Sequence, residues 1–177
     1  QSGMALVVHL PLSKKNETSR TTEKKNLYLL TTAEMVADAT LMEVTRKDIR
    51  QPFQAKLVLM DYAANLALLN IDNLKFWDGL IPIKWSPVKS KTRVDDNNVY
   101  SFNIKSAQEW EIDSGKIQLM AVGHRIVSDS WFPLLKLSGF SKGRQGSPLI
   151  QENETVGMIL EADKGKAIPT QMLLEFL

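Results

Sequence analysis

A glycine-containing turn near the end of the chain has the composition of a loop that could support acyl-transfer chemistry. It spans residues 140–150 and places Arg144 and Gln145 between Gly143 and Gly146. Glycines let a backbone turn tightly with its N–H groups converging on one point, where they would stabilise the oxyanion of an acyl-transfer intermediate. Gln145 lies inside this turn, and a carboxamide is not a nucleophile. Taken alone, the segment fits a plain turn before a strand equally well.

Two other polar residues stand beside apolar runs. Glu34 lies in a short helix-forming stretch, Ala33–Ala37, directly after the strand-like run Leu27–Thr31. Asn65 directly precedes the apolar run Leu66–Asp72. Each residue also has an ordinary interpretation, because an exposed acid suits a short helix and Asn suits a turn before a strand.

Together the three segments resemble the protease domain of trypsin-like (peptidase S1 fold) serine proteases of the HtrA/Deg type. That family has a nucleophile loop Gly-Asp/Asn-Ser-Gly-Gly/Ser-Pro-Leu/Val, a Leu-Thr-Asn/Ala-Ala-His-Val strand and helix, and an Asp-Leu-Ala-Leu-Leu strand. The resemblance puts Glu34, Asn65 and Gln145 at the positions of the catalytic His, Asp and Ser, in the family's order. The implied oxyanion loop is degenerate as well, and it consists of Gly143, Arg144, Gln145, Gly146 and Ser147.

The resemblance covers roughly residues 27–177. Residues 112–117 look like the family's Val-Thr-x-Gly-x-Ile/Val strand, and Ala167-Ile168-Pro169 look like its ending before the terminal helix. Before Leu27 the chain departs, because residues 21–26 replace the family's Gly-Ser-Gly.

The resemblance implies an all-β fold of two antiparallel six-stranded-type β-barrels with a short C-terminal helix. We expect one trypsin-like domain over residues 1–177. Within it, the N-terminal barrel is expected over 1–78, a connection over 79–98, and the C-terminal barrel with the terminal helix over 99–177.

Hydrophobic patterning independently favours many short strands. Apolar, β-branched or alternating runs of strand length predict strands at 4–12, 27–31, 40–46, 53–61, 66–72, 99–104, 111–122, 132–137, 147–151 and 155–161. A helix is expected over Pro169–Leu177, because Pro suits a helix start and good helix formers follow it. Patterning alone leaves a pair of barrels and a sandwich both open.

Composition restricts the remaining classes of function. The 177 residues, 44% hydrophobic and 24% charged, suit one globular domain. A formal charge of +2 gives no reason to expect nucleic acid as a partner. The chain has no cysteine, no His/Cys cluster and no Gly-rich phosphate loop, so we expect neither a metal nor a cofactor. No apolar run is long enough to cross a bilayer, so we expect no membrane insertion.

A different active site would have to use one of two histidines, His9 or His124. The serines nearest the degenerate loop are Ser138, Ser141 and Ser147. Because a histidine-activated serine must lie within hydrogen-bond reach of its base, a serine hydrolase with a relocated nucleophile is the alternative hypothesis.

The preferred interpretation is a proteolytically inactive protease homologue, a pseudoprotease, that acts as a protein-binding, scaffolding or regulatory domain. Its partner is expected to be a protein or peptide, and a homo-oligomer is left open. The resemblance also implies an extracytoplasmic setting, the bacterial periplasm, and allows a PDZ-like domain elsewhere in the full-length protein.

Overall fold

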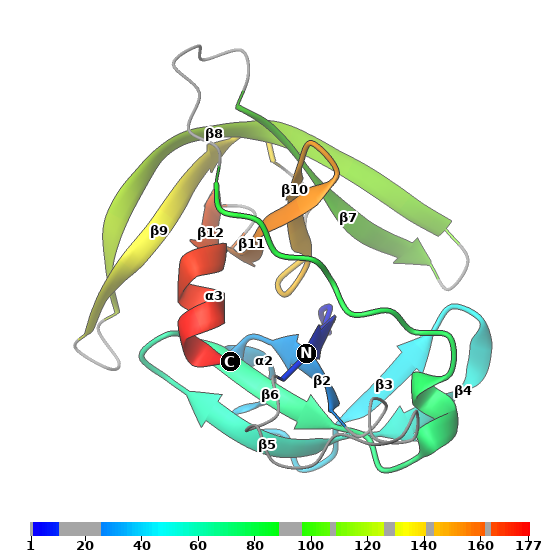
Figure 1. The fold of residues 1–177 in the computed structure, drawn as a ribbon. Coiled ribbons are helices and arrows are strands. Elements are labelled where there is room, and N and C mark those ends of the chain that lie inside the picture. The colour runs from blue at the N-terminus through cyan, green and yellow to red at the C-terminus, as the bar shows by residue number, and fades with distance from the viewer. Residues whose placement is uncertain are drawn as a thin grey trace, which may run out of the picture.

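The computed structural model describes residues 2–10, 26–88, 97–106, 109–125, 130–140, 144–161 and 164–177. Gly143, Ser141 and the predicted strand end at residues 11–12 lie outside the described residues. Nearly all the regular structure is antiparallel strand, arranged in two halves that follow one another along the chain (Figure 1).

The described residues of the N-terminal half form six strands and two short helices. They are β1 (Leu6–His9), β2 (Leu27–Thr31), α2 (Ala33–Val36), β3 (Glu43–Arg46), β4 (Ile49–Gln54), β5 (Lys56–Asp61), β6 (Leu66–Asn70) and the 3-10 helix η1 (Leu74–Trp77). Four strands form a sheet in the order β1-β2-β6-β5, while β3 and β4 pair separately. The run predicted as one strand over 53–61 is divided at Ala55, whose N–H donates to the Met42 carbonyl. The chain therefore turns a corner there, from one sheet into the other.

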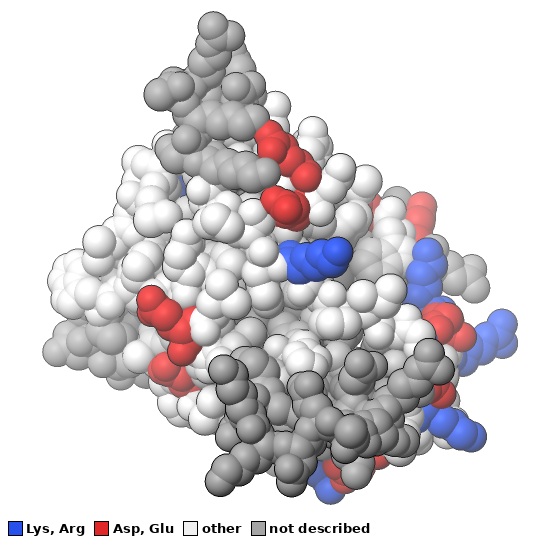
Figure 2. Space-filling view, viewed as in Figure 1, with Lys and Arg blue, Asp and Glu red and all other residues white. Residues whose placement is uncertain are grey.

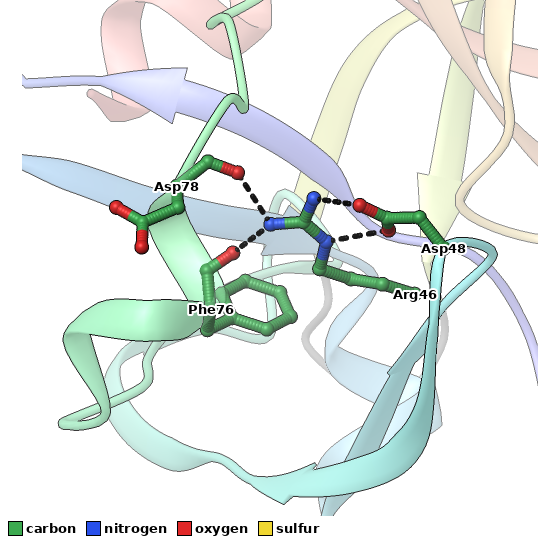
Figure 3. A network of polar contacts seen from close by, with 4 residues as sticks. All are labelled: Arg46, Asp48, Phe76 and Asp78. Atoms are coloured by element: carbon green, nitrogen blue, oxygen red, sulfur yellow. Dashed lines mark hydrogen bonds and ion pairs between the residues drawn. The ribbon is translucent and has the colours of Figure 1, made fainter.

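Arg46 ties the β3–β4 pair to η1 (Figure 3). Its guanidinium donates to the main-chain carbonyls of Phe76 and Asp78 and pairs with the carboxylate of Asp48. The hydrogen bond from Arg46 holds the pKa of Asp48 below its ordinary value. Because carbonyls at the end of a short helix lack main-chain donors, the cation satisfies groups that would otherwise need water.

The C-terminal half is a closed six-stranded barrel. Its strands are β7 (Asn98–Ser106), β8 (Glu109–Arg125), β9 (Ser130–Ser138), β10 (Pro148–Gln151), β11 (Glu154–Glu161) and β12 (Lys166–Pro169), joined in the order β10-β11-β12-β9-β8-β7. Val99, Leu135, Leu149 and Ile159 fill its interior and are fully shielded from solvent. Closure gives each described strand of this half a neighbour on both sides.

One hydrophobic core is shared by the two halves. Leu6, Val8 and Leu66 of the first half lie in the same buried cluster as Met158 and Leu173 of the second. Leu173 belongs to α3 (Thr170–Phe176), which begins directly after Pro169 as the sequence indicated. The short terminal helix therefore closes over the junction between the halves.

The predicted β class is confirmed: the structure consists mostly of antiparallel strands, one half forms a closed six-stranded barrel, and a short helix ends the chain. Three elements lie wholly or mostly outside the predicted strands and helices: η1, β12 and β4, of which only residues 53–54 fall in a predicted strand. β12 is only four residues long and includes Pro169, and it pairs with β11, which directly precedes it, and with β9. Local patterning cannot reveal a strand that tertiary pairing creates.

Candidate functional site

Asn65 fixes the helix that carries Glu34. It precedes β6, is 2% exposed, and has a left-handed backbone with φ 57°. Its main-chain carbonyl accepts from Ala33 N–H at 3.1 Å, and its side-chain Oδ1 accepts from Glu34 N–H at 3.0 Å. These two N–H groups lie in the first turn of α2, where no intrahelical acceptor exists. Asn is among the few residues that tolerate a left-handed backbone. Asn65 can therefore adopt this conformation and also supply acceptors for both N–H groups.

Gln145 meets Glu34 across the junction of the two halves. Gln145 Nε2 donates to Glu34 Oε2 at 3.1 Å, although the residues are 111 positions apart in the sequence. The structure therefore brings together all three predicted site residues, linked as Asn65 to Glu34 to Gln145. Glu34 itself is exposed at the surface.

Gly146 and Ser147 set the shape of the turn that carries Gln145. Gly146 has φ +83°, and a Cβ there would lie 2.0 Å from the Met4 carbonyl oxygen. Its N–H donates to the Ile159 carbonyl at 2.9 Å, and Ser147 N–H donates back to the Arg144 carbonyl at 3.0 Å. Only glycine fits this position, because both the conformation and the close backbone exclude a side chain.

Met4 lines the inner side of the turn, a role that the sequence motifs did not reveal. Its N–H donates to the Gln145 carbonyl at 2.9 Å, and its own carbonyl accepts from Thr31 Oγ1 at 2.8 Å. Ser147 Oγ donates to Met4 Sδ at 3.0 Å, and Ser147 is completely buried. The small Gly3 before the first strand was a signal available in the sequence, since a Cβ there would lie 2.9 Å from the Gln145 carbonyl oxygen.

The linked groups are chemically unreactive toward a carbonyl. Gln145 Nε2 is an amide nitrogen whose lone pair is delocalised, so it donates hydrogen bonds but does not attack. Glu34 could act as a base, but the group that it contacts carries no hydroxyl to activate. Asn65 is neutral, and its Oδ1 is already engaged by the main chain of α2. The three residues are therefore linked in the order of a catalytic triad, but Gln145 has no hydroxyl proton to pass to Glu34.

Of the residues considered for a second site, the structure describes the side chains of His9, Ser138 and Ser147. His9 is exposed on β1, and no hydrogen bond among the described residues joins it to a serine. His124 lies in β8 opposite Trp131. Ser138 lies in β9 opposite Lys116, away from any described histidine in the strand register.

Metal and membrane features are absent from the described part of the chain. Within it, no group of three His, Asp or Glu side chains could hold a metal ion. No helix in this part is long and apolar enough to span a membrane. On the face shown in Figure 2, the described Lys and Arg residues are interspersed with Asp and Glu.

Curated proteins similar in sequence are Do-like proteins of Arabidopsis thaliana. The mitochondrial protein Do-like 3 is 28% identical over 157 residues, and the mitochondrial protease Do-like 4 is 25% identical over 157 residues. Each match covers 84% of this chain but only 27% and 29% of the relative. The chain thus spans little more than a quarter of the length of these relatives. No family model matches it.

Solved structures of HtrA-type proteases share the fold. The HtrA-type protease AlgW with a decapeptide superposes with a TM-score of 0.66 at 21% identity, over 84% of this chain and 46% of that one. The MamO protease domain from Magnetospirillum magneticum superposes with a TM-score of 0.65 at 18% sequence identity, over 85% of this chain and 82% of that one. The chain therefore has the trypsin-like fold of HtrA-type protease domains, and the resemblance drawn from its sequence motifs is confirmed.

Proposed function

We propose that this chain is a pseudoprotease: an HtrA/Deg-type domain that keeps the protease fold, lacks proteolytic activity and binds a protein or peptide partner. The observation that carries the proposal is the hydrogen bond from Gln145 Nε2 to Glu34 Oε2. It supports the assignment of Glu34, Asn65 and Gln145 to the His, Asp and Ser positions of a triad. The three members of a triad lie within hydrogen-bond reach of one another, so residues at those positions must also lie close together.

We further infer that residues 1–177 act as a single unit. The shared core around Leu66 and Leu173 supports this, because separating the halves would expose apolar surface of both. The proposed internal division remains the one expected from the sequence, with a connection over 79–98.

A peptide or protein partner is proposed because the fold is retained where the chemistry is not. The similar AlgW structure contains a decapeptide, so a peptide is the first class of ligand to test. We expect binding without turnover: an immobilised peptide library should yield a bound sequence that mass spectrometry recovers intact after prolonged incubation. Cleavage of the recovered peptide would contradict the proposal.

The direct test of inactivity is labelling with a fluorophosphonate probe, which reacts only with an activated serine. We expect no labelling and no hydrolysis of unfolded casein, because Gln145 supplies no hydroxyl. Stoichiometric labelling of one serine would instead establish the alternative, a serine hydrolase with a relocated nucleophile, and peptide mapping would identify that serine.

The compartment is also a proposal. An extracytoplasmic setting in the bacterial periplasm follows from the general resemblance, whereas the names of the curated relatives place those proteins in mitochondria. Immunolocalisation in the source cells distinguishes the two.

A further inference from the structure

β5 ends the N-terminal sheet with an open edge. It pairs with β6 on one side, and no hydrogen bond joins its other side to any residue that the structure describes. Figure 1 shows β5 on the rim of the N-terminal half, on the side away from the C-terminal barrel. At the opposite end of the sheet, β1 is covered, because its Val7 carbonyl accepts from Ile83 N–H at 2.9 Å. The free N–H and C=O groups of β5 are therefore a template for another strand.

The side chains along this edge are apolar in the middle and charged at both ends. Leu57, Val58 and Leu59 are 42%, 50% and 49% exposed. Lys56 begins the strand and Asp61 ends it, so the two ends carry opposite charges. Natural sheet edges are commonly protected by charges within the strand or by bulges. In β5 the charges stand at the ends, where Lys56 also pairs with Asp72 of its own chain, and a bulge lies between Leu57 and Leu59.

A β-bulge between Leu57 and Leu59 decides which side chains share a face. Lys56, Leu59 and Asp61 pair with Asn70, Leu68 and Leu66, which alternate along β6 and so lie on one face of the sheet. Leu57 and Met60 pair with Leu69 and Ala67 on the other face. The bulge leaves Val58 out of the alternation. Counted outward from Leu59, the first aligned residues are therefore Leu57 and Met60, and the second are Lys56 and Asp61.

This symmetry makes the edge complementary to itself. If two copies pair antiparallel about a two-fold axis at Leu59, Leu57 of each copy lies opposite Met60 of the other, on the same face. Lys56 of each copy then lies opposite Asp61 of the other, again on the same face, so both ends of the ladder join opposite charges. A two-fold interface requires this kind of self-complementary patch. Opposite charges directly across a strand pair stabilise it, and like charges oppose it.

We propose that β5 pairs with β5 of a second copy of this chain, forming a homodimer through a continuous antiparallel sheet. The apolar centre and the oppositely charged ends favour a second copy, because it matches both charges in one register. The inference is independent of the inactivity proposed above, since it uses none of the residues of the Glu34 and Gln145 site.

Sedimentation equilibrium of the purified chain from micromolar to millimolar concentration tests the dimer. We expect a reversible monomer–dimer equilibrium that Leu59→Lys weakens at least about tenfold, because it places two lysines opposite each other at the axis. Ile81→Lys, at a residue 80% exposed and outside β5, is the matched control and should leave the equilibrium unchanged. A strictly monomeric chain, or a dimer unaffected by Leu59→Lys, would overturn the proposal.

A charge exchange tests the register itself. Lys56→Glu and Asp61→Lys should each weaken self-association, because each variant places like charges opposite at both ends, whereas an equimolar mixture should restore a heterodimer. Asp61 Oδ1 also accepts from Ala63 and Ala64 N–H, so circular dichroism must show that Asp61→Lys is folded. If it is not, Leu59→Cys decides the question: the chain has no native cysteine, so mild oxidation should give a disulfide dimer, and a persistent monomer contradicts the pairing.

Discussion

Asn65 and Gly146 hold the two sides of the site, and both have a left-handed backbone. The side chain is needed at Asn65, whereas none can fit at Gly146. Each has a left-handed conformation just before a strand, with φ 57° at Asn65 before β6 and +83° at Gly146 before β10. At Asn65 the side chain is required, because its Oδ1 accepts the first-turn N–H of Glu34. At Gly146 no side chain can be present, because the Met4 carbonyl occupies its space.

The first turn of α2 and the turn at Gly146 are both held through main-chain groups. Gly146 makes no use of a side chain, and Asn65 uses an oxygen that an aspartate at the same position also has, so the geometry does not require a serine at 145 or a histidine at 34. Across the junction the side chains of Gln145 and Glu34 share a hydrogen bond, and the Gln145 main-chain carbonyl accepts from Met4 N–H. Stability should therefore depend strongly on the two anchors and weakly on that side-chain bond.

Gly146→Ala should give the largest effect. A methyl group would overlap backbone of the Met4 segment and would hold a left-handed conformation, so we expect a loss of about 3 kcal/mol in the free energy of unfolding. Urea denaturation followed by tryptophan fluorescence measures it. Gly79→Ala is the matched control, since Gly79 has φ +72° with nothing within 4 Å of the added Cβ. The control should lose only about 1 kcal/mol, and equal losses would refute the steric part of the account.

Asn65→Ala should give an intermediate effect. Removing Oδ1 leaves Glu34 N–H without this acceptor, and the alanine must still adopt a left-handed backbone. We expect the free energy of unfolding to fall by about 2 kcal/mol. Asn65→Gly relieves the backbone and should lose roughly 1 kcal/mol. Thermal denaturation of both variants separates the two contributions. If Asn65→Ala were as stable as the native chain, Asn65 would not be an anchor.

The Gln145–Glu34 bond should give the smallest effect. It is exposed, so a double-mutant cycle of Glu34→Ala and Gln145→Ala should show a coupling energy of about 0.5 kcal/mol. Denaturant titration of the four proteins measures it. A coupling as large as the loss caused by Gly146→Ala would mean that the side chains, and not the backbone, hold the site together.

The sequence predicted most clearly those features that local patterning determines. β2 was predicted at its observed bounds, Leu27–Thr31, because an apolar and β-branched run carries its own strand signal. The strand predicted from residue 40 begins instead at Glu43, since its first residues do not join the ladder with β4. Strand ends depend on where the partner strand begins, which patterning does not show.

The site was predictable only in part, because its contacts are distant in the sequence. The motifs indicated Glu34, Asn65 and Gln145, and the structure brings them together. Met4 could not be found in this way, since its role arises from a contact between the first strand and a turn some 140 residues later, at Ser147. The pairing of β3 with β4 was missed because the first four residues of β4, 49–52, are mostly polar and include Pro52, and because Ala55 divides the run predicted over 53–61.

Restoring the catalytic groups stepwise tests the central claim, that Glu34, Asn65 and Gln145 stand at triad positions. The variants are Gln145→Ser, then Gln145→Ser with Glu34→His, then both with Asn65→Asp, assayed with an activated ester. The single variant should be inactive because the serine lacks its base, and the double should be poor because loss of the orienting carboxylate costs about 10⁴-fold in studied triads. Only the triple variant is expected to give esterase activity above background. Equal activity of the single and triple variants would show that Glu34 and Asn65 do not occupy those positions.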